Sequence, residues 1–237
     1  MKKLIQSAEF DIKEKNTYII LLSAPVLLSI WWYFGRAVSF TKMFPEAVLK
    51  PNFDFTAHIF QFAMFFVLMF IVPVLTLKLI FKEKLSDYGF QRGDKKFGLS
   101  FVALAIPLII APIIYFAADM PDIRSEYPLA KILLTKHEFI FQYEILYVLF
   151  YYIAWEFFFR GFILFGVQKR FGSFNAILIQ TISSCLIHIG KPAGETIGAI
   201  IVGILFGVIA LRTRSIWYVL LLHAAIGVLT DLFVIFK

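Results

Sequence analysis

Seven long apolar stretches dominate the sequence and limit what the chain can fold into. A bilayer has a hydrocarbon core of roughly 30 Å, which about 20 helical residues cross. Backbone hydrogen bonds must be satisfied within that core, which a helix does by itself. We therefore expect an all-α polytopic membrane bundle with about seven transmembrane helices, in a range of about six to eight. The stretches lie near residues 18–37, 57–81, 97–118, 139–167, 173–190, 195–211 and 215–236.

The composition agrees with a membrane protein. Hydrophobic residues make up 60% of the chain and the mean hydropathy is +0.82, whereas roughly 45–50% apolar residues is usual for a soluble domain. No linker rich in proline, glycine or serine divides the sequence, so we predict a single membrane domain over residues 1–237. The first apolar stretch begins only at Tyr18 and lacks a small-residue cleavage site, so we interpret it as a retained span.

The net charge of +7 is explained by membrane orientation rather than by a nucleic-acid partner, because the basic residues lie mostly between the apolar stretches. If the N-terminus is cytoplasmic, fourteen basic residues fall inside and eight outside. The positive-inside rule then predicts a cytoplasmic N-terminus and an external C-terminus. We expect an integral protein of a bacterial plasma membrane with lipid as its surroundings. The inside residues are Lys2, Lys3, Lys13, Lys15, Lys78, Lys82, Lys84, Arg92, Lys95, Lys96, Lys169, Arg170, Arg212 and Arg214.

Polar residues within the spans are concentrated in the second half of the chain. The interiors of the first three stretches carry no acidic or basic residue, whereas the last four contain Glu156, Arg160, His188, His223 and Asp231. A charge near the centre of a membrane helix costs about 2.5–3.5 kcal/mol on insertion scales, so such residues usually face the bundle interior and mark a site. The C-terminal half is therefore where we expect the chemistry.

Glu156 and Arg160 are four residues apart, which places them on one helix face where an ion pair can form. The pair alone is equally compatible with a purely structural role, in which it neutralises itself and joins two helices. His188 and His223 fall on two other spans, so a Glu and two His could converge from three helices.

Such a set, Glu156 with His188 and His223, could position a water molecule or bind a divalent metal such as zinc. Each histidine taken alone is more often a hydrogen-bonded core residue. Cys185 lies three residues before His188 and could supply a thiolate, although buried packing is the commoner role of a lone cysteine.

Other polar and small residues have simpler interpretations. Asp231 lies eight residues after His223 and could instead be near the outer interface. His58 and His137 sit at span edges and are expected to be interfacial. Glycines 203 and 207 have the GxxxG spacing of a close-packing helix face, with a further glycine at 198.

Four segments of the sequence resemble short motifs of known proteins. AWEFFFRGF at residues 154–162 is similar to the motif EExxxR-G, and SCLIH at 184–188 and HAAIG at 223–227 match the motifs FxxxH and HxxxN at their histidines. DYGF at 87–90 resembles a short segment that follows the early spans. Together, over about residues 80–236, these segments resemble the CPBP family of intramembrane proteases, which includes CAAX prenyl proteases and bacteriocin-processing (Abi) proteins.

The resemblance implies an intramembrane endopeptidase that cleaves membrane-associated peptides or proteins. In the family, buried Glu and His activate water, while a second His and an Asn stabilise the oxyanion. Carried over position by position, these roles fall on Glu156, His188 and His223, with Arg160 as the motif arginine. The metal positions implied for a metalloendopeptidase would be Glu156, His188 and His223.

The sequence departs from the family pattern at three positions. Trp155 replaces the first Glu, the usual catalytic base; Ser184 replaces a Phe; and Gly227 replaces the Asn. Glu156 would have to act as the base, although neighbouring helical residues point about 100° apart. The alternative is a non-catalytic relative that binds membrane helices or lipidated peptides as a scaffold or immunity protein. A transporter is a third reading, which the charge-free first half disfavours.

Overall fold

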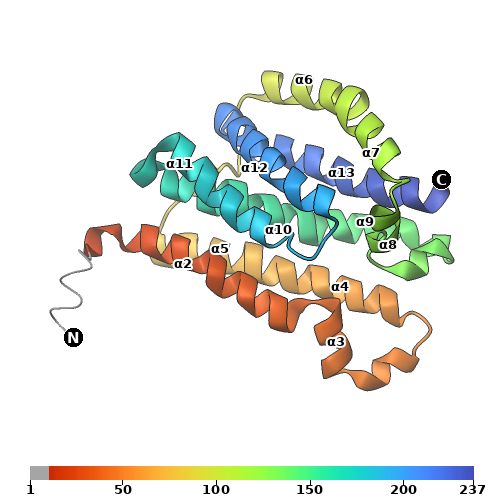
Figure 1. Cartoon of the computed structure of the whole chain (residues 1–237). Coiled ribbons are helices and arrows are strands. Elements are labelled where there is room, and N and C mark those ends of the chain that lie inside the picture. Colours follow the sequence, from red (N-terminus) through yellow and green to blue (C-terminus); the bar gives the residue numbers. More distant parts are fainter. Residues whose placement is uncertain (1–10) are drawn as a thin grey trace.

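The computed structural model describes residues 11–237, and this part of the chain is built from helices without a strand (Figure 1). The predicted polytopic helical bundle is confirmed. Lys2 and Lys3, which contribute to the charge prediction, lie outside the described residues. Six helical stretches within residues 11–237 are long and apolar enough to cross a membrane: Ile12–Gly35, Phe53–Phe81, Lys95–Ala117, His137–Leu186, Ala193–Thr213 and Trp217–Phe236.

The stretches combine α-helical segments with short 3₁₀ and π-helical turns. The α-helices are α2 (Lys15–Ile30), α3 (Ala37–Met43), α4 (Phe53–Phe66), α5 (Val72–Leu75), α6 (Lys95–Ala105), α7 (Ala111–Ala117), α8 (Pro121–Glu126), α9 (Ile140–Leu146), α10 (Ile153–Glu156), α11 (Leu164–Leu186), α12 (Ala193–Thr213) and α13 (Trp217–Phe236). The π-helical turns are Trp31–Gly35, Val67–Ile71, Thr76–Phe81, Ile106–Ile110, Tyr147–Tyr152 and Phe157–Ile163. The 3₁₀ turns are Ile12–Glu14, Pro45–Leu49, Leu85–Tyr88, Lys131–Leu134 and His137–Phe139.

The longest stretch, His137–Leu186, is not one straight helix. Its 50 residues would extend well beyond the bilayer, because a helix rises about 1.5 Å per residue and the hydrocarbon core is roughly 30 Å thick. Gly172 breaks it, with φ 78° and ψ 166°, in a region that favours glycine. The chain turns back there (Figure 1), so this stretch accounts for both the fourth and the fifth predicted crossing.

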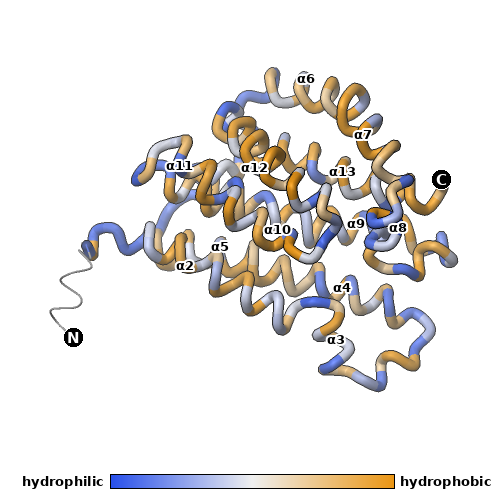
Figure 2. The backbone as a smooth tube through the Cα atoms, viewed as in Figure 1, coloured by the Kyte–Doolittle hydropathy of each residue, from blue (hydrophilic) through white to orange (hydrophobic). Residues whose placement is uncertain are grey.

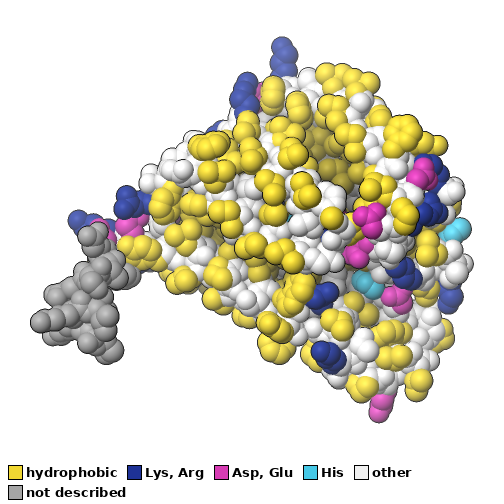
Figure 3. Space-filling model, viewed as in Figure 1, with side chains coloured by type: hydrophobic (Ala, Val, Ile, Leu, Met, Phe, Trp, Pro, Cys, Tyr) yellow, Lys and Arg dark blue, Asp and Glu magenta, His cyan; other side chains and the backbone are white. Residues whose placement is uncertain are grey.

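Successive crossings run in opposite directions, which sorts the connecting segments between two ends of the bundle (Figure 1). Residues 82–94, the break at Gly172 and the turn at 214–216 lie at the end where α2 begins. Residues 118–136 and the turn at 187–192 lie at the other end, near the C-terminus. Hydrophilic residues gather toward both ends (Figure 2), and hydrophobic side chains cover much of the face between them (Figure 3). This is the pattern expected of a protein surrounded by lipid.

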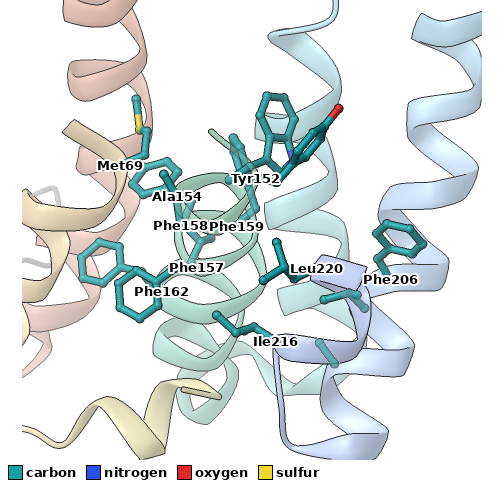
Figure 4. Close-up of a cluster of buried hydrophobic side chains, with 14 of the residues drawn as sticks. Met69, Tyr152, Ala154, Phe157, Phe158, Phe159, Phe162, Phe206, Ile216 and Leu220 are labelled. Carbon is teal, nitrogen blue, oxygen red and sulfur yellow. The ribbon is translucent and has the colours of Figure 1, made fainter. Parts of the chain in front are cut away.

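The core forms around the fourth crossing. Most of its apolar window is buried, whereas the other five membrane-spanning stretches keep most of theirs at the surface. Phe157, Phe158 and Phe159 are all fully buried, which assigns them to packing between helices rather than to contact with lipid. Figure 4 shows this cluster, in which Met69 and Phe206 approach the same helix from other parts of the chain. The fourth crossing is thus the central helix that positions the site.

The GxxxG pair packs α12 closely against α11, as predicted. An added Cβ at Gly203 would come within 2.9 Å of Thr181, and one at Gly207 within 3.1 Å of Ile177. Gly198 has no such neighbour within 4 Å, so it does not belong to this contact face.

The segment that contains residues 87–90 packs against the end of the central helix. Gly89 has φ 75°, and its carbonyl accepts a hydrogen bond of 3.0 Å from Ile216 N. The carbonyl of Tyr88 lies 3.0 Å from where a Cβ of Gly161 would be, so a glycine follows Arg160 where the backbone of another segment approaches closely.

Candidate active site

The four predicted site residues come from three parts of the bundle. Glu156 ends α10, and Arg160 lies in the π-helical turn Phe157–Ile163 that follows it. His223 lies in α13, and His188 lies in the turn after α11. Short π-helical turns inside α-helices are frequent at functional sites, because they change which side chains share a face.

Glu156 is the centre of the cluster and is completely buried. Its Oε1 lies 2.5 Å from His223 Nδ1 and 3.3 Å from Arg160 Nη1. Its Oε2 is buried without a hydrogen-bond partner. Arg160 is also buried, with its guanidinium over the Phe206 ring. The ion pair offsets the burial of both charges, since both side chains are almost completely buried.

His223 connects this buried pair to the surface of the site. With Nδ1–H donating to the Glu156 carboxylate, the neutral ring keeps a lone pair on Nε2. The His223 side chain is 16% exposed, whereas that of Glu156 is 0% exposed. The imidazole is flanked by Tyr152, with ring centroids 4.8 Å apart, and by Phe206 at 5.9 Å. His223 is therefore the member of the pair that another molecule can reach.

His188 does not join this cluster directly. Its Nδ1 hydrogen bonds to the Ser184 carbonyl at 2.7 Å, and its Nε2 is 4.0 Å from Glu195 Oε1. The Trp155 ring meets His188 at a centroid distance of 5.2 Å and His223 at 5.6 Å, edge-on in both cases. The structure thus brings Glu156 and His223 together with Arg160, while the Trp155 ring contacts both His188 and His223.

Several polar side chains near His188 are bonded to one another. The Tyr127 hydroxyl donates to Glu195 Oε1 at 2.8 Å, and Lys191 Nζ bonds to Glu126 at 3.0 Å. Burial, and then the negative charge of Glu195, raises the pKa of Tyr127 well above its usual value. These bonds connect residues 126–127, which precede the central helix, to the turn between α11 and α12 and to the first turn of α12.

Asp231 is fully buried in the C-terminal half of α13, eight residues after His223. It shares one face of α13 with His223 and Gly227, at successive spacings of four residues. Its carboxyl group lies close to that of Glu144 in α9, and neither group has a hydrogen-bond partner among the described residues. Glu144 is an acidic residue inside the apolar stretch 139–167, and that position is the signal by which the sequence indicates it.

The remaining polar predictions have structural roles. Cys185 is half-buried, with Sγ 3.6 Å from the Thr196 carbonyl, in agreement with packing. His58 bonds to the Asp54 carbonyl at 2.9 Å within α4, and the His137 ring packs against Phe236.

The expected metal ligands do not form a ligand set in this arrangement. Among residues 11–237, no group of three or more His, Cys, Asp or Glu side chains is placed to hold a metal ion. Zinc sites use three or four such ligands. Glu156 Oε1 and His223 Nδ1 are turned toward each other, and His188 Nδ1 is bonded to the Ser184 carbonyl. We therefore derive no step through a metal.

The fold and the cluster define a polytopic helical membrane protein with a buried Glu–Arg–His site between its fourth and last crossings. Residues 138–229 match the family model described as Type II CAAX prenyl endopeptidase Rce1-like. The match includes Glu156, Arg160, His188 and His223, so the resemblance seen in the motifs is confirmed over this segment, which is shorter than residues 80–236. No curated protein and no solved structure matches the chain.

Proposed function

We propose that the chain is an intramembrane endopeptidase of the CAAX-protease type, which cleaves membrane-associated peptides or proteins by water attack. The observation that carries this proposal is the hydrogen bond of 2.5 Å between Glu156 Oε1 and His223 Nδ1 inside the bundle. A carboxylate that holds an imidazole in one tautomer, with the other nitrogen free, is a recurring arrangement in hydrolysis.

In this proposal His223 is the general base. Its Nε2 takes a proton from water as the water oxygen bonds to the carbonyl carbon of the scissile peptide. Glu156 is less suited to direct proton transfer, because its free oxygen is fully buried and its other oxygen is already bonded. This assigns to Glu156 the role of orienting His223 and stabilising the imidazolium that forms.

The proton returns in the second half of the reaction. The tetrahedral oxyanion collapses, the C–N bond breaks, and the Nε2 proton passes to the leaving amine. The products are a carboxylate-terminated and an amine-terminated peptide, with one water consumed. Arg160 holds the Glu156 carboxylate in place throughout, and the apolar surroundings strengthen both interactions.

The second candidate is a non-catalytic member that binds membrane helices or lipidated peptides. It is favoured by Trp155, whose indole contacts both histidines where the family pattern has a carboxylate. It is also favoured by Gly227, which offers no side chain to an oxyanion.

Purified protein in lipid vesicles, incubated with short membrane-associated peptides bearing free, acylated or prenylated C-termini, tests the proposal by mass spectrometry of the products. We expect cleavage by the wild type and its loss in Glu156→Gln and His223→Ala. His58→Ala is the matched control, since His58 lies in α4 outside the cluster. Parallel samples with a chelator and with added zinc test metal dependence. An inert wild type would favour the non-catalytic candidate.

A further inference from the structure

Tyr152 occupies a position that the proposed reaction has not yet used. It is buried in the π-helical turn that precedes α10, four residues before Glu156. Its hydroxyl lies directly against the backbone of Gly227 in α13, so closely that a Cβ added to this glycine would overlap the hydroxyl oxygen. A residue other than glycine at 227 would therefore displace the Tyr152 ring.

The Tyr152–Gly227 contact belongs to the interface between the fourth and last crossings, which also contains the Glu156–His223 pair. Gly227 lies four residues after His223 on α13, and Tyr152 lies four residues before Glu156 on the opposite helix. Because the two helices run antiparallel, the Tyr152–Gly227 contact lies about one helical turn from the Glu156–His223 contact. The Tyr152 ring lies edge-on to His223, with centroids 4.8 Å apart.

We infer that the Tyr152 hydroxyl is the hydrogen-bond donor that stabilises the oxyanion of the tetrahedral intermediate, an inference that rests on the proposed function. A phenol is a neutral donor, which suits a buried site next to an imidazole that becomes positively charged. A donor fixed by packing before the reaction starts requires no reorganisation when the charge develops. The bare backbone of Gly227 makes room for this hydroxyl beside the reacting carbonyl.

Tyr152→Phe removes only the hydroxyl and is the primary test. We expect kcat to fall about 10²–10³-fold, the usual effect of removing one oxyanion donor, with KM nearly unchanged. Thermal stability should stay close to the wild type, since the ring still packs on Gly227. Tyr143→Phe is the matched control, because it removes an equally buried hydroxyl nine residues earlier on the same helix and should leave kcat unchanged.

A rescue separates a donor role from simple packing. Gly227→Asn alone should destabilise the protein, because the new side chain overlaps Tyr152. Tyr152→Ala combined with Gly227→Asn clears that space and supplies an amide donor, so it should cleave faster than Tyr152→Ala. If the wild type cleaves and Tyr152→Phe is equally fast, this inference is wrong and the proposed function stands. If the wild type is inert under every condition, both the oxyanion role of Tyr152 and the proposed function are wrong.

Discussion

One oxygen of Glu156 accepts from two partners, with His223 Nδ1 at 2.5 Å and Arg160 Nη1 at 3.3 Å. Both partners approach from within the bundle, and the Glu156 and Arg160 side chains are almost completely buried. The arrangement makes a buried carboxylate tolerable and at the same time fixes the orientation of an imidazole. Stability and the proposed chemistry therefore depend on the same three side chains.

Replacing either Glu156 or Arg160 with leucine should destabilise the protein strongly. Each change leaves one buried charge without its partner, which typically costs about 3–5 kcal/mol. The double replacement should cost less than either single one, because it removes both charges. Thermal unfolding in detergent, followed by circular dichroism, measures these effects. Arg212→Leu breaks an exposed ion pair with Asp94 and is the control, for which we expect little change. Equal, small effects at all three positions would show that the pair is not buried.

Asp231→Asn should be tolerated far better than Asp231→Leu. The Asp231 and Glu144 carboxyl groups lie close together inside the bundle without a hydrogen-bond partner among the described residues, and a hydrogen bond between them requires a shared proton. An amide at 231 donates to Glu144 without needing that proton, whereas leucine leaves Glu144 unsatisfied. Thermal stability of the two variants, compared with Glu144→Gln, checks this. A loss of stability in Asp231→Asn as large as in Asp231→Leu would contradict the pairing.

The crossings could be predicted from the sequence because hydrophobic length alone determines them. The fourth and fifth crossings were predicted as separate stretches, and the backbone conformation of Gly172 shows why they separate there. The ion pair of Glu156 and Arg160 also followed from spacing, since residues four apart on a helix must be neighbours.

What spacing could not predict were contacts between helices. The contact of Glu156 with His223 and the packing of Tyr152 on Gly227 both depend on how the fourth and last crossings align. The π-helical turns Tyr147–Tyr152 and Phe157–Ile163 change that alignment, and no residue pattern in the sequence identified them. The contacts of Trp155 with His188 and His223 could not be predicted, because in the sequence Trp155 is only a departure from the family pattern.

Cysteine labelling in intact cells should place residues 82–94 in the cytoplasm and residues 118–136 outside. The expectation follows from the positive-inside rule, and the two segments lie at opposite ends of the bundle. Lys84→Cys and Asp122→Cys suit this test, because both side chains are exposed. Gly93 does not, since a Cβ there would overlap the Thr213 carbonyl. With Cys185 replaced by alanine, an impermeant maleimide should label only Asp122→Cys. Labelling of Lys84→Cys instead would invert the orientation.

Trp155→Glu tests whether this position limits the chemistry. The change places a second carboxylate next to Glu156 and in contact range of both His188 and His223, where the indole lies now. Stability should fall, because replacing a buried tryptophan with a smaller side chain leaves a cavity, and truncation to alanine typically costs about 3–5 kcal/mol. Trp155→Gln is the matched control, since it makes nearly the same cavity without the charge. We expect Trp155→Glu to cleave membrane-associated peptides faster than Trp155→Gln, because only the carboxylate can accept a proton from water.

Gly227 is left unchanged in this experiment, because an asparagine there would collide with Tyr152. Equal rates for the two variants would show that Trp155 acts through packing alone. Cleavage by Trp155→Glu but not by the wild type would identify the natural chain as a non-catalytic binding protein.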